Sequence, residues 1–264
     1  MRSLFTLTKT SLLGSMLILS LIQCKSEPVM EKEIPVTIEE MKTIQFESMD
    51  DLEISADLYL NQSKEAPFIL LFHQAGFSRG EYREIAPRLV KLGFSCIAID
   101  QRSGQAVNNV SNETRARASE QGLGTEYVHA LPDLIATVGF IKAEFQPETL
   151  IIWGSSYSAS LSFILANIQA DDIDGVVAFS PGSYFEMNGK SIVEFASTTS
   201  CPVFMTSSRD EGPSRMELFE AIPAKQKAFF VPELAGFHGS KALWAENEGH
   251  QAYWSALEAF LKTF

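Results

Sequence analysis

Hydrophobic and polar residues follow two different patterns along this chain of 264 residues, and the change between them predicts the fold. The segments "TIQFES" and "LEISADLYL", within residues 43–60, place every second residue on one apolar face, which is typical of half-buried strands. The acidic "MDD" between them supplies a turn. We therefore expect the domain to begin with an antiparallel hairpin.

The pattern then changes to short, unbroken apolar runs: "FILLF", "CIAID", "LIIW", "GVVAF", "CPVFM" and "KAFFV". Segments with helical spacing lie between them, and a polar stretch over residues 101–125 follows neither pattern. Continuous apolar strands that alternate with helices indicate a mostly parallel sheet covered on both faces. We predict one α/β domain over residues 43–264, with about eight strands.

The first 42 residues are not expected to belong to this domain. Arg2 and Lys9 precede an apolar run of 12 residues, "SLLGSMLILSLI", which is the length of a signal peptide and too short to span a membrane. The following "LIQC" resembles the lipobox of bacterial lipoproteins, in which Cys24 would be acylated. We interpret residues 1–23 as a signal peptide and 24–42 as a lipidated tether, and expect a protein of the bacterial cell envelope, anchored through lipid only.

Charge and cysteine content exclude several functions. A formal net charge of −12 argues against a nucleic-acid partner, which requires clustered lysine and arginine. Cys96 and Cys201 each lie in an apolar run, so we expect buried free thiols. The spacing of cysteine and histidine offers no metal site.

A small, polar corner directly follows the apolar run "LIIW". Gly154-Ser155-Ser156-Tyr157-Ser158 fits G-x-S-x-S, close to the G-x-S-x-G nucleophile elbow between a strand and a helix. Residues two positions either side of the central serine lie where strand and helix nearly touch, so they must be small. This places Ser156 as the nucleophile. A simpler reading is an ordinary turn in which Ser156 caps the helix.

A serine nucleophile needs a base and an acid that orients the base. His238 lies in a glycine-flanked loop after the last strand and is the expected base, whereas His250 falls on the apolar stripe of the last helix. The acid should follow another strand, where "SSRDEG" offers Asp210 and Glu211. We favour Asp210, with Glu211 as the fallback.

An oxyanion hole requires backbone N–H groups directed at the reacting carbonyl oxygen. The amide of Tyr157, just after the nucleophile, is one expected donor. The loop "HQAGF" after the first parallel strand should supply the other, from Ala75 or else from Gln74. His73 is expected to brace this loop.

Taken together, "LFHQAG", "IDQRSG", "GSSYS", "SSRDEG" and "FHGSKAL" resemble, in this order, the α/β-hydrolase family and most of all its dienelactone-hydrolase-like branch. The resemblance covers residues 43–264. It implies an eight-stranded α/β-hydrolase fold, structural roles for Asp100 and Arg102, and hydrolysis of a small ester or related acyl substrate without a cofactor. Dienelactone hydrolases have a cysteine nucleophile where this chain has Ser156. Phe77, Tyr184 and Phe185 are candidates for the pocket wall.

Two other functions remain open at this stage. A peptidase or acyltransferase on the same fold would carry the same motifs, because specificity depends on pocket shape. A non-catalytic envelope lipoprotein could keep the fold as a binding module, although such a module would not need serine, acid and histidine together.

Overall fold

The two predicted kinds of strand form a single eight-stranded sheet in the order β1-β2-β4-β3-β7-β8-β9-β10. The computed structural model describes residues 41–264, so the predicted signal peptide, Cys24 and nearly all of the tether lie outside the described residues. β1 and β2 form the expected antiparallel hairpin, β2 also runs antiparallel to β4, and the remaining neighbours are parallel. The strands are β1 (Lys42–Glu47), β2 (Glu53–Tyr59), β3 (Phe68–Phe72), β4 (Ser95–Ile99), β7 (Leu150–Ser155), β8 (Gly175–Phe179), β9 (Val203–Thr206) and β10 (Lys227–Phe230).

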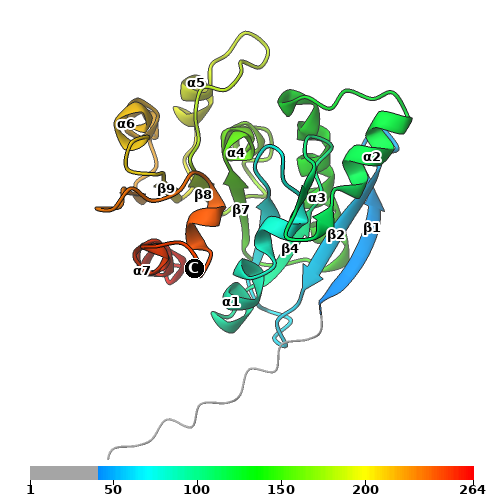
Figure 1. The fold of residues 1–264 in the computed structure, drawn as a ribbon, viewed down its shortest axis with the longest axis horizontal. Helices are drawn as coiled ribbons and strands as arrows, with labels where there is room; N and C mark the ends of the chain where they lie inside the picture. Colours follow the sequence, from blue (N-terminus) through cyan, green and yellow to red (C-terminus); the bar gives the residue numbers. More distant parts are fainter. Residues whose placement is uncertain (1–40) are drawn as a thin grey trace, which may run out of the picture. The chain divides into compact units, whose positions relative to one another are not determined.

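Helices cover both faces of the sheet, as Figure 1 shows, with α1 and α7 on one side and α3, α4, α5 and α6 on the other. The helices are α1 (Ile85–Lys91), α2 (Glu113–Glu120), α3 (Leu131–Glu144), α4 (Tyr157–Ile168), α5 (Ile192–Ala196), α6 (Gly212–Ala221) and α7 (His250–Leu261). Three 3-10 turns, η1 (Arg79–Tyr82), η2 (Tyr127–Ala130) and η3 (Ser240–Leu243), join them. The predicted α/β-hydrolase fold is confirmed.

Successive strand residues face opposite sides, so each central strand contributes to two cores. In β7, Leu150 and Ile152 pack under α4, while Ile151 and Trp153 pack toward α1 and α7. Every residue of β3, β7 and β8 is buried. The central strands are therefore apolar throughout, and their ends are held rigidly.

The polar stretch at residues 101–125 is more regular than its sequence indicates. It contains a small two-stranded sheet, β5 (Ala106–Val107) with β6 (Val110–Ser111), and the helix α2. The sequence "ETRARASE" has no apolar stripe, so α2 was not expected. Its N-cap Asn112 accepts a hydrogen bond from the Arg115 amide, and this local signal does favour a helix start.

Pro132 lies at the start of a helix. It lies in the first turn of α3, where the missing amide hydrogen costs nothing because the first helical amides have no intrahelical acceptor. Asp100 and Arg102 are structural, as expected. The Asp100 carboxylate accepts from the Arg79 amide and guanidinium, and Arg102 forms a buried ion pair with Asp133 at 2.7 Å.

The two cysteines of the described residues are both free thiols, as expected. Cys96 is fully buried in β4, but Cys201 is only partly buried. No helix within residues 41–264 is both long enough and apolar enough to cross a membrane.

Candidate active site

Ser156 lies on a strained turn between β7 and α4. Its backbone has φ +60° and ψ −121°, a conformation that L residues rarely adopt and that costs about 1–3 kcal/mol. Gly154 is needed to form this turn, because a Cβ there would lie 2.3 Å from the Ser158 carbonyl oxygen and the Ala159 amide. The turn presents the serine hydroxyl at the carboxyl end of the sheet, as a nucleophile elbow requires.

Ser158, which replaces the second glycine of the elbow motif, is accommodated by hydrogen bonds. Its Oγ accepts from the Ser155 amide at 3.0 Å. The single hydroxyl hydrogen faces the carbonyl oxygens of Phe72, His73 and Ser155, at 2.7, 2.9 and 2.8 Å. Ser158 therefore links the elbow to the end of β3, and the departure from glycine leaves the elbow intact.

His238 lies where the sequence predicted it, in the loop after β10. Its Nε2 is 2.7 Å from the Ser156 Oγ, and about a third of its side chain is exposed. Gly239, with φ +75°, turns the chain directly after it and donates its amide hydrogen to Ser180 Oγ at 3.0 Å. His250, the rejected alternative, begins α7, where its side chain is only partly buried, and its imidazole Nε2 is 3.5 Å from Gln251 Nε2.

The acid that orients His238 is Glu211, so the preference for Asp210 was wrong. Glu211 Oε1 is 2.5 Å from His238 Nδ1, whereas the Asp210 side chain is exposed to solvent. Glu211 immediately precedes α6, and the chain there already has helical dihedrals, φ −79° and ψ −26°. This direction of the backbone turns Glu211 toward the histidine and Asp210 away from it.

Glu211 is held by more than its histidine. Its other oxygen, Oε2, accepts from Ser180 Oγ at 2.8 Å, and from Ser208 N and Oγ at 3.1 and 3.0 Å. Burial alone would raise the pKa of Glu211. The hydrogen bond and charge of His238, together with the donors from Ser180 and Ser208, outweigh burial and lower the pKa to about 2. The carboxylate is therefore ionised at neutral pH, and its hydrogen bonds fix its position.

Two backbone amides are available for an oxyanion hole. Tyr157 is the first residue of α4, so its amide has no intrahelical acceptor. The Ala75 amide, in the partly buried loop after β3, has no acceptor within residues 41–264. The alternative donor, Gln74, is not available, because its amide donates to the Glu81 carboxylate at 2.8 Å.

His73 braces this loop, as expected. Its Nδ1 is 2.9 Å from the Gln74 carbonyl oxygen, and its Nε2 accepts from the Gln101 amide at 3.0 Å. The side chain is fully buried, and burial lowers the pKa of His73 to about 4. The neutral imidazole therefore fixes the loop that carries Ala75 against the end of β4.

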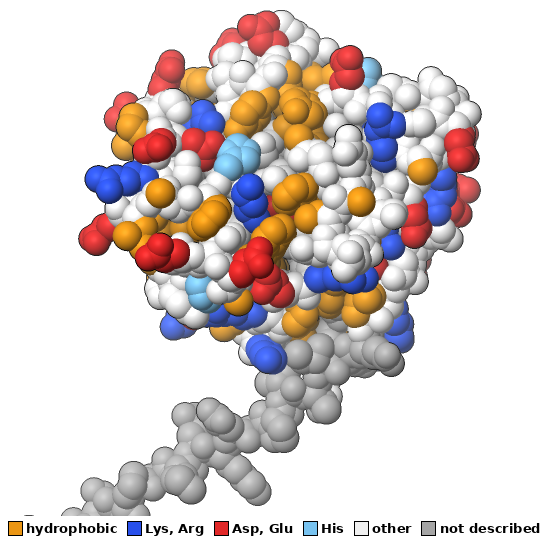
Figure 2. Space-filling view, viewed as in Figure 1, with side chains coloured by type: hydrophobic (Ala, Val, Ile, Leu, Met, Phe, Trp, Pro, Cys, Tyr) orange, Lys and Arg blue, Asp and Glu red, His pale blue; other side chains and the backbone are white. Residues whose placement is uncertain are grey.

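A cavity of about 320 Å³ is lined by residues that contact Tyr157 of the elbow, although Ser156 and His238 are not in its wall. Its walls include the Tyr127 ring, which stacks on Tyr157 at 4.6 Å between centroids, and Ser103, whose carbonyl accepts from the Tyr157 hydroxyl. Tyr184 and Phe185 complete the aromatic wall, as the sequence suggested. Figure 2 shows hydrophobic side chains gathered over the middle of the face that it presents. Phe77, the third aromatic candidate, instead stacks on Trp244.

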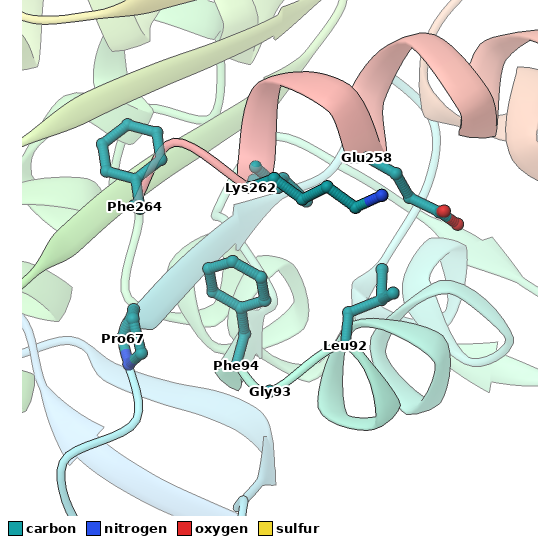
Figure 3. A pocket seen from close by; sticks show the side chains of 8 residues that line it. Pro67, Leu92, Gly93, Phe94, Glu258, Lys262 and Phe264 are labelled. Atoms are coloured by element: carbon teal, nitrogen blue, oxygen red, sulfur yellow. The ribbon is translucent and has the colours of Figure 1, made fainter. Parts of the chain in front are cut away.

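A second cavity of similar volume lies far from this chemistry. It is at the amino ends of β3 and β4, beside the start of each strand, and has no part of Ser156, His238 or Glu211 in its wall. Figure 3 shows Pro67, Phe94 and Phe264 around it, with Glu258 and Lys262 on the α7 side. Within residues 41–264, no three side chains of histidine, cysteine, aspartate or glutamate are gathered as metal ligands.

Comparison with known proteins agrees with this geometry. Residues 63–230 match the family described as serine aminopeptidase, S33. No curated protein sequence matches the chain. Among solved structures, the chain is similar to the esterase Pf2001 of Pyrococcus furiosus, with 16% identity, a TM-score of 0.63, and coverage of 85% of this chain and 90% of that one.

Two further solved structures have the same fold. The dienelactone hydrolase of Anabaena variabilis has 13% identity and a TM-score of 0.66, over 85% of this chain and 98% of its own. The peroxisomal α/β-hydrolase Lpx1 of Saccharomyces cerevisiae has 11% identity and a TM-score of 0.63, over 85% and 88%. Identities at this level establish the shared fold.

Proposed function

The chain belongs to the serine aminopeptidase S33 family of hydrolases, and we propose that it is a carboxylesterase that acts through an acyl-serine intermediate. The observation that carries the proposal is the pair of hydrogen bonds at His238, 2.7 Å to Ser156 Oγ on one side and 2.5 Å to Glu211 on the other. A serine on a strained elbow, a histidine base and a fixed carboxylate form the arrangement that activates a hydroxyl for acyl transfer.

The reaction follows from these positions. Ser156 Oγ attacks the ester carbonyl carbon while His238 Nε2 takes the hydroxyl proton. His238 then returns that proton to the leaving alkoxide, and the alcohol departs. Water attacks the acyl-serine with His238 again acting as base, and the acid and free serine are released. Glu211 keeps the Nδ1 proton in place throughout and stabilises the imidazolium that forms in each half-reaction.

The developing negative charge on the carbonyl oxygen is stabilised by the amides of Tyr157 and Ala75. The Tyr157 amide stands at the N-terminus of α4, so the helix dipole adds to its effect. Loss of one such donor typically lowers the rate by about 10²–10³-fold.

The cavity beside the elbow favours a small or medium-sized acyl or aryl group. Its volume of about 320 Å³ and its wall of Tyr127, Tyr184 and Phe185 suit an apolar group of modest size. The structurally similar esterase and dienelactone hydrolase support ester substrates for this chain.

The family description supports one other candidate, an aminopeptidase. The same triad would cleave an amide, and the exposed Glu126 at the cavity edge could pair with a substrate ammonium group. A panel of p-nitrophenyl esters and aminoacyl p-nitroanilides separates the two. We expect the esters to be hydrolysed with kcat/KM at least about a hundredfold higher, and the reverse order would make the protein a peptidase.

The nucleophile is tested by covalent labelling. A fluorophosphonate should add one adduct to the intact protein, and Ser156→Ala should abolish both the adduct and ester hydrolysis. Ser155→Ala, which leaves the Ser156 hydroxyl in place, should still carry one adduct at completion, although the adduct should form more slowly. An equal adduct on the Ser156→Ala protein would refute the assignment.

We also propose that the enzyme works at the bacterial cell envelope, tethered through a lipid on Cys24. The support is the sequence alone: the basic start, the apolar run, "LIQC" and the charged tether. A single acyl chain holds a protein only marginally, whereas two or more anchor it stably. The diacylglyceryl group implied by the lipobox resemblance would therefore keep the protein on the membrane.

A further inference from the structure

Glu81 is a fully buried carboxylate that the reaction as described does not use. It lies in η1, and its relative exposure is 0%. No lysine or arginine forms an ion pair with it among residues 41–264. A carboxylate buried without a cation destabilises a fold unless hydrogen bonds compensate for its lost hydration. The burial of Glu81 therefore requires hydrogen bonds that compensate for its lost hydration.

The Glu81 carboxylate joins two segments of the active site directly. Oε2 accepts from the Gln74 amide at 2.8 Å, in the oxyanion loop, residues 73–77. Oε1 accepts from Ser155 Oγ at 2.7 Å, in the nucleophile elbow, residues 154–158. Gln74 and Ser155 immediately precede Ala75 and Ser156. Each contact is thus one residue from a group that acts on the substrate.

A third segment is joined through Ser155. The Ser240 amide donates to Ser155 Oγ at 2.8 Å, and Ser240 lies two residues after His238 in the histidine loop, residues 237–240. The backbone carbonyl of Glu81 also accepts from Trp244 Nε1 at 2.9 Å, which fixes η1 against the chain that follows this loop. One side chain therefore connects nucleophile, oxyanion donor and base.

We propose that Glu81 is a positioning residue of the hydrolytic reaction: its buried carboxylate fixes the oxyanion loop to the nucleophile elbow and, through Ser155, holds the histidine loop in register with both. The inference rests on the proposed esterase function and adds a residue to it. It explains why the Gln74 amide is withdrawn from the oxyanion hole while that of Ala75 is left free.

Burial, hydrogen bonds and one nearby lysine together determine the pKa of Glu81. Burial is the main cause that raises the pKa of Glu81, to about 7, against the hydrogen bonds from Gln74 and Ser155 and the charge of Lys241 in η3, which lower it. The phenols of Tyr82 in η1 and Tyr157 in α4 lie near enough for the charge of Glu81 to raise their pKa values, and burial keeps both neutral.

Glu81→Gln should preserve the network. The amide oxygen can accept from the Gln74 N–H, and the NH₂ group can donate to Ser155 Oγ. The Ser155 hydroxyl proton then needs a new acceptor, and the buried Gln74 Oε1, which has no hydrogen-bond donor among residues 41–264, can accept it. Gln74 Oε1 and Ser155 Oγ lie on the same side of Gly239, because a Cβ added there would be 2.2 Å from Gln74 Oε1 and 2.6 Å from Ser155 Oγ. Glu81→Ala, in contrast, removes both links.

The test compares Glu81→Ala, Glu81→Gln and the control Glu84→Ala in the full chain. Glu84 is exposed on the same segment, and its carboxylate accepts from the Ala245 amide at 3.2 Å, so it controls for loss of a contact to the C-terminal region. For p-nitrophenyl ester hydrolysis, we expect Glu81→Ala to lower kcat about 10- to 100-fold with KM within twofold. Glu81→Gln should stay within about threefold of wild type, and Glu84→Ala should be unchanged.

The rate of fluorophosphonate labelling should fall in parallel with kcat, since acylation needs the same three segments. A folded Glu81→Ala protein with wild-type kcat, or equal losses in the alanine and glutamine variants, would overturn the proposal. Should Glu81→Ala not fold, Ser155→Ala carries the test: lowered kcat at unchanged KM supports the link, and wild-type kcat refutes it. Absence of ester hydrolysis by the wild-type protein would instead refute the esterase proposal itself.

Discussion

The replacement of Glu211 by glutamine is the sharpest test of the active-site geometry. The Glu211 carboxylate accepts from His238 Nδ1 on one oxygen and from Ser208 N on the other. A glutamine can satisfy only one of these N–H donors, because its NH₂ group must face the other. With NH₂ toward His238, the imidazole must carry its proton on Nε2, where it can no longer accept the proton of Ser156.

The expected loss is large. A histidine held in the wrong tautomer lowers kcat by about 10⁴-fold in serine hydrolases, which corresponds to about 5.5 kcal/mol of transition-state stabilisation. The matched control is Asp210→Asn, which removes the neighbouring, exposed carboxylate and should leave kcat within about twofold. Because the pKa of Glu211 is lowered to about 2, the wild-type carboxylate should stay ionised throughout a pH profile from 4 to 9.

The assay is kcat and KM for a p-nitrophenyl ester over that pH range, with circular dichroism to establish that each variant is folded. A folded Glu211→Gln enzyme within tenfold of wild type would refute the assignment of the acid. A larger loss in Asp210→Asn than in Glu211→Gln would show that the loop after β9 adopts a different register in solution.

Three further predictions follow from other features. Gly154→Ala should inactivate the enzyme and lower its melting temperature, because the new Cβ would lie 2.3 Å from backbone atoms of α4; a fully active variant would contradict the elbow geometry. The pKa of Glu81 rises from 4.5 to about 7 on folding, so the folded state binds more protons between these values and its stability falls as pH rises through 7, by up to about 3 kcal/mol. Glu81→Gln should therefore gain stability relative to wild type between pH 5 and pH 8 in thermal denaturation, and a constant difference would argue against that shift. In a bacterial host, Cys24→Ser should move the protein from the detergent phase to the aqueous phase; a wild-type protein already in the aqueous phase, without acyl mass on its N-terminal peptide, would refute the anchor.

The fold and the nucleophile could be predicted because each follows from local pattern. Unbroken apolar runs of about five residues between helical segments are typical of strands covered on both sides. The small residues around Ser156 meet a steric requirement that the structure shows at Gly154. His238 was identifiable because it is the histidine in a glycine-flanked loop after the last strand. Each of these inferences depended on a few adjacent residues.

The acid and the positioning carboxylate could not be predicted in the same way. Asp210 and Glu211 are adjacent and have the same charge. Which of them faces His238 depends on the residue at which α6 begins, and a shift of one residue would exchange them. The Gly212-Pro213 pair was a signal for that start, since proline is favoured in the first helical turn. Glu81 lies in the polar string "SRGEYRE", which a sequence pattern assigns to the surface. Its burial depends on Ser155 and Gln74, which only the folded chain brings to it.

The position of β10 has a consequence for how the enzyme fails on heating. Ser156 follows a central strand whose residues are all buried. His238 follows β10, an edge strand that pairs only with β9 and has no buried residue. Edge segments with few buried contacts open by local unfolding at a free energy below that of the whole domain. The amides of β10 should therefore exchange with deuterium before those of β3 and β7. Esterase activity should disappear several degrees below the main calorimetric transition, with the nucleophile still in place and its base already displaced.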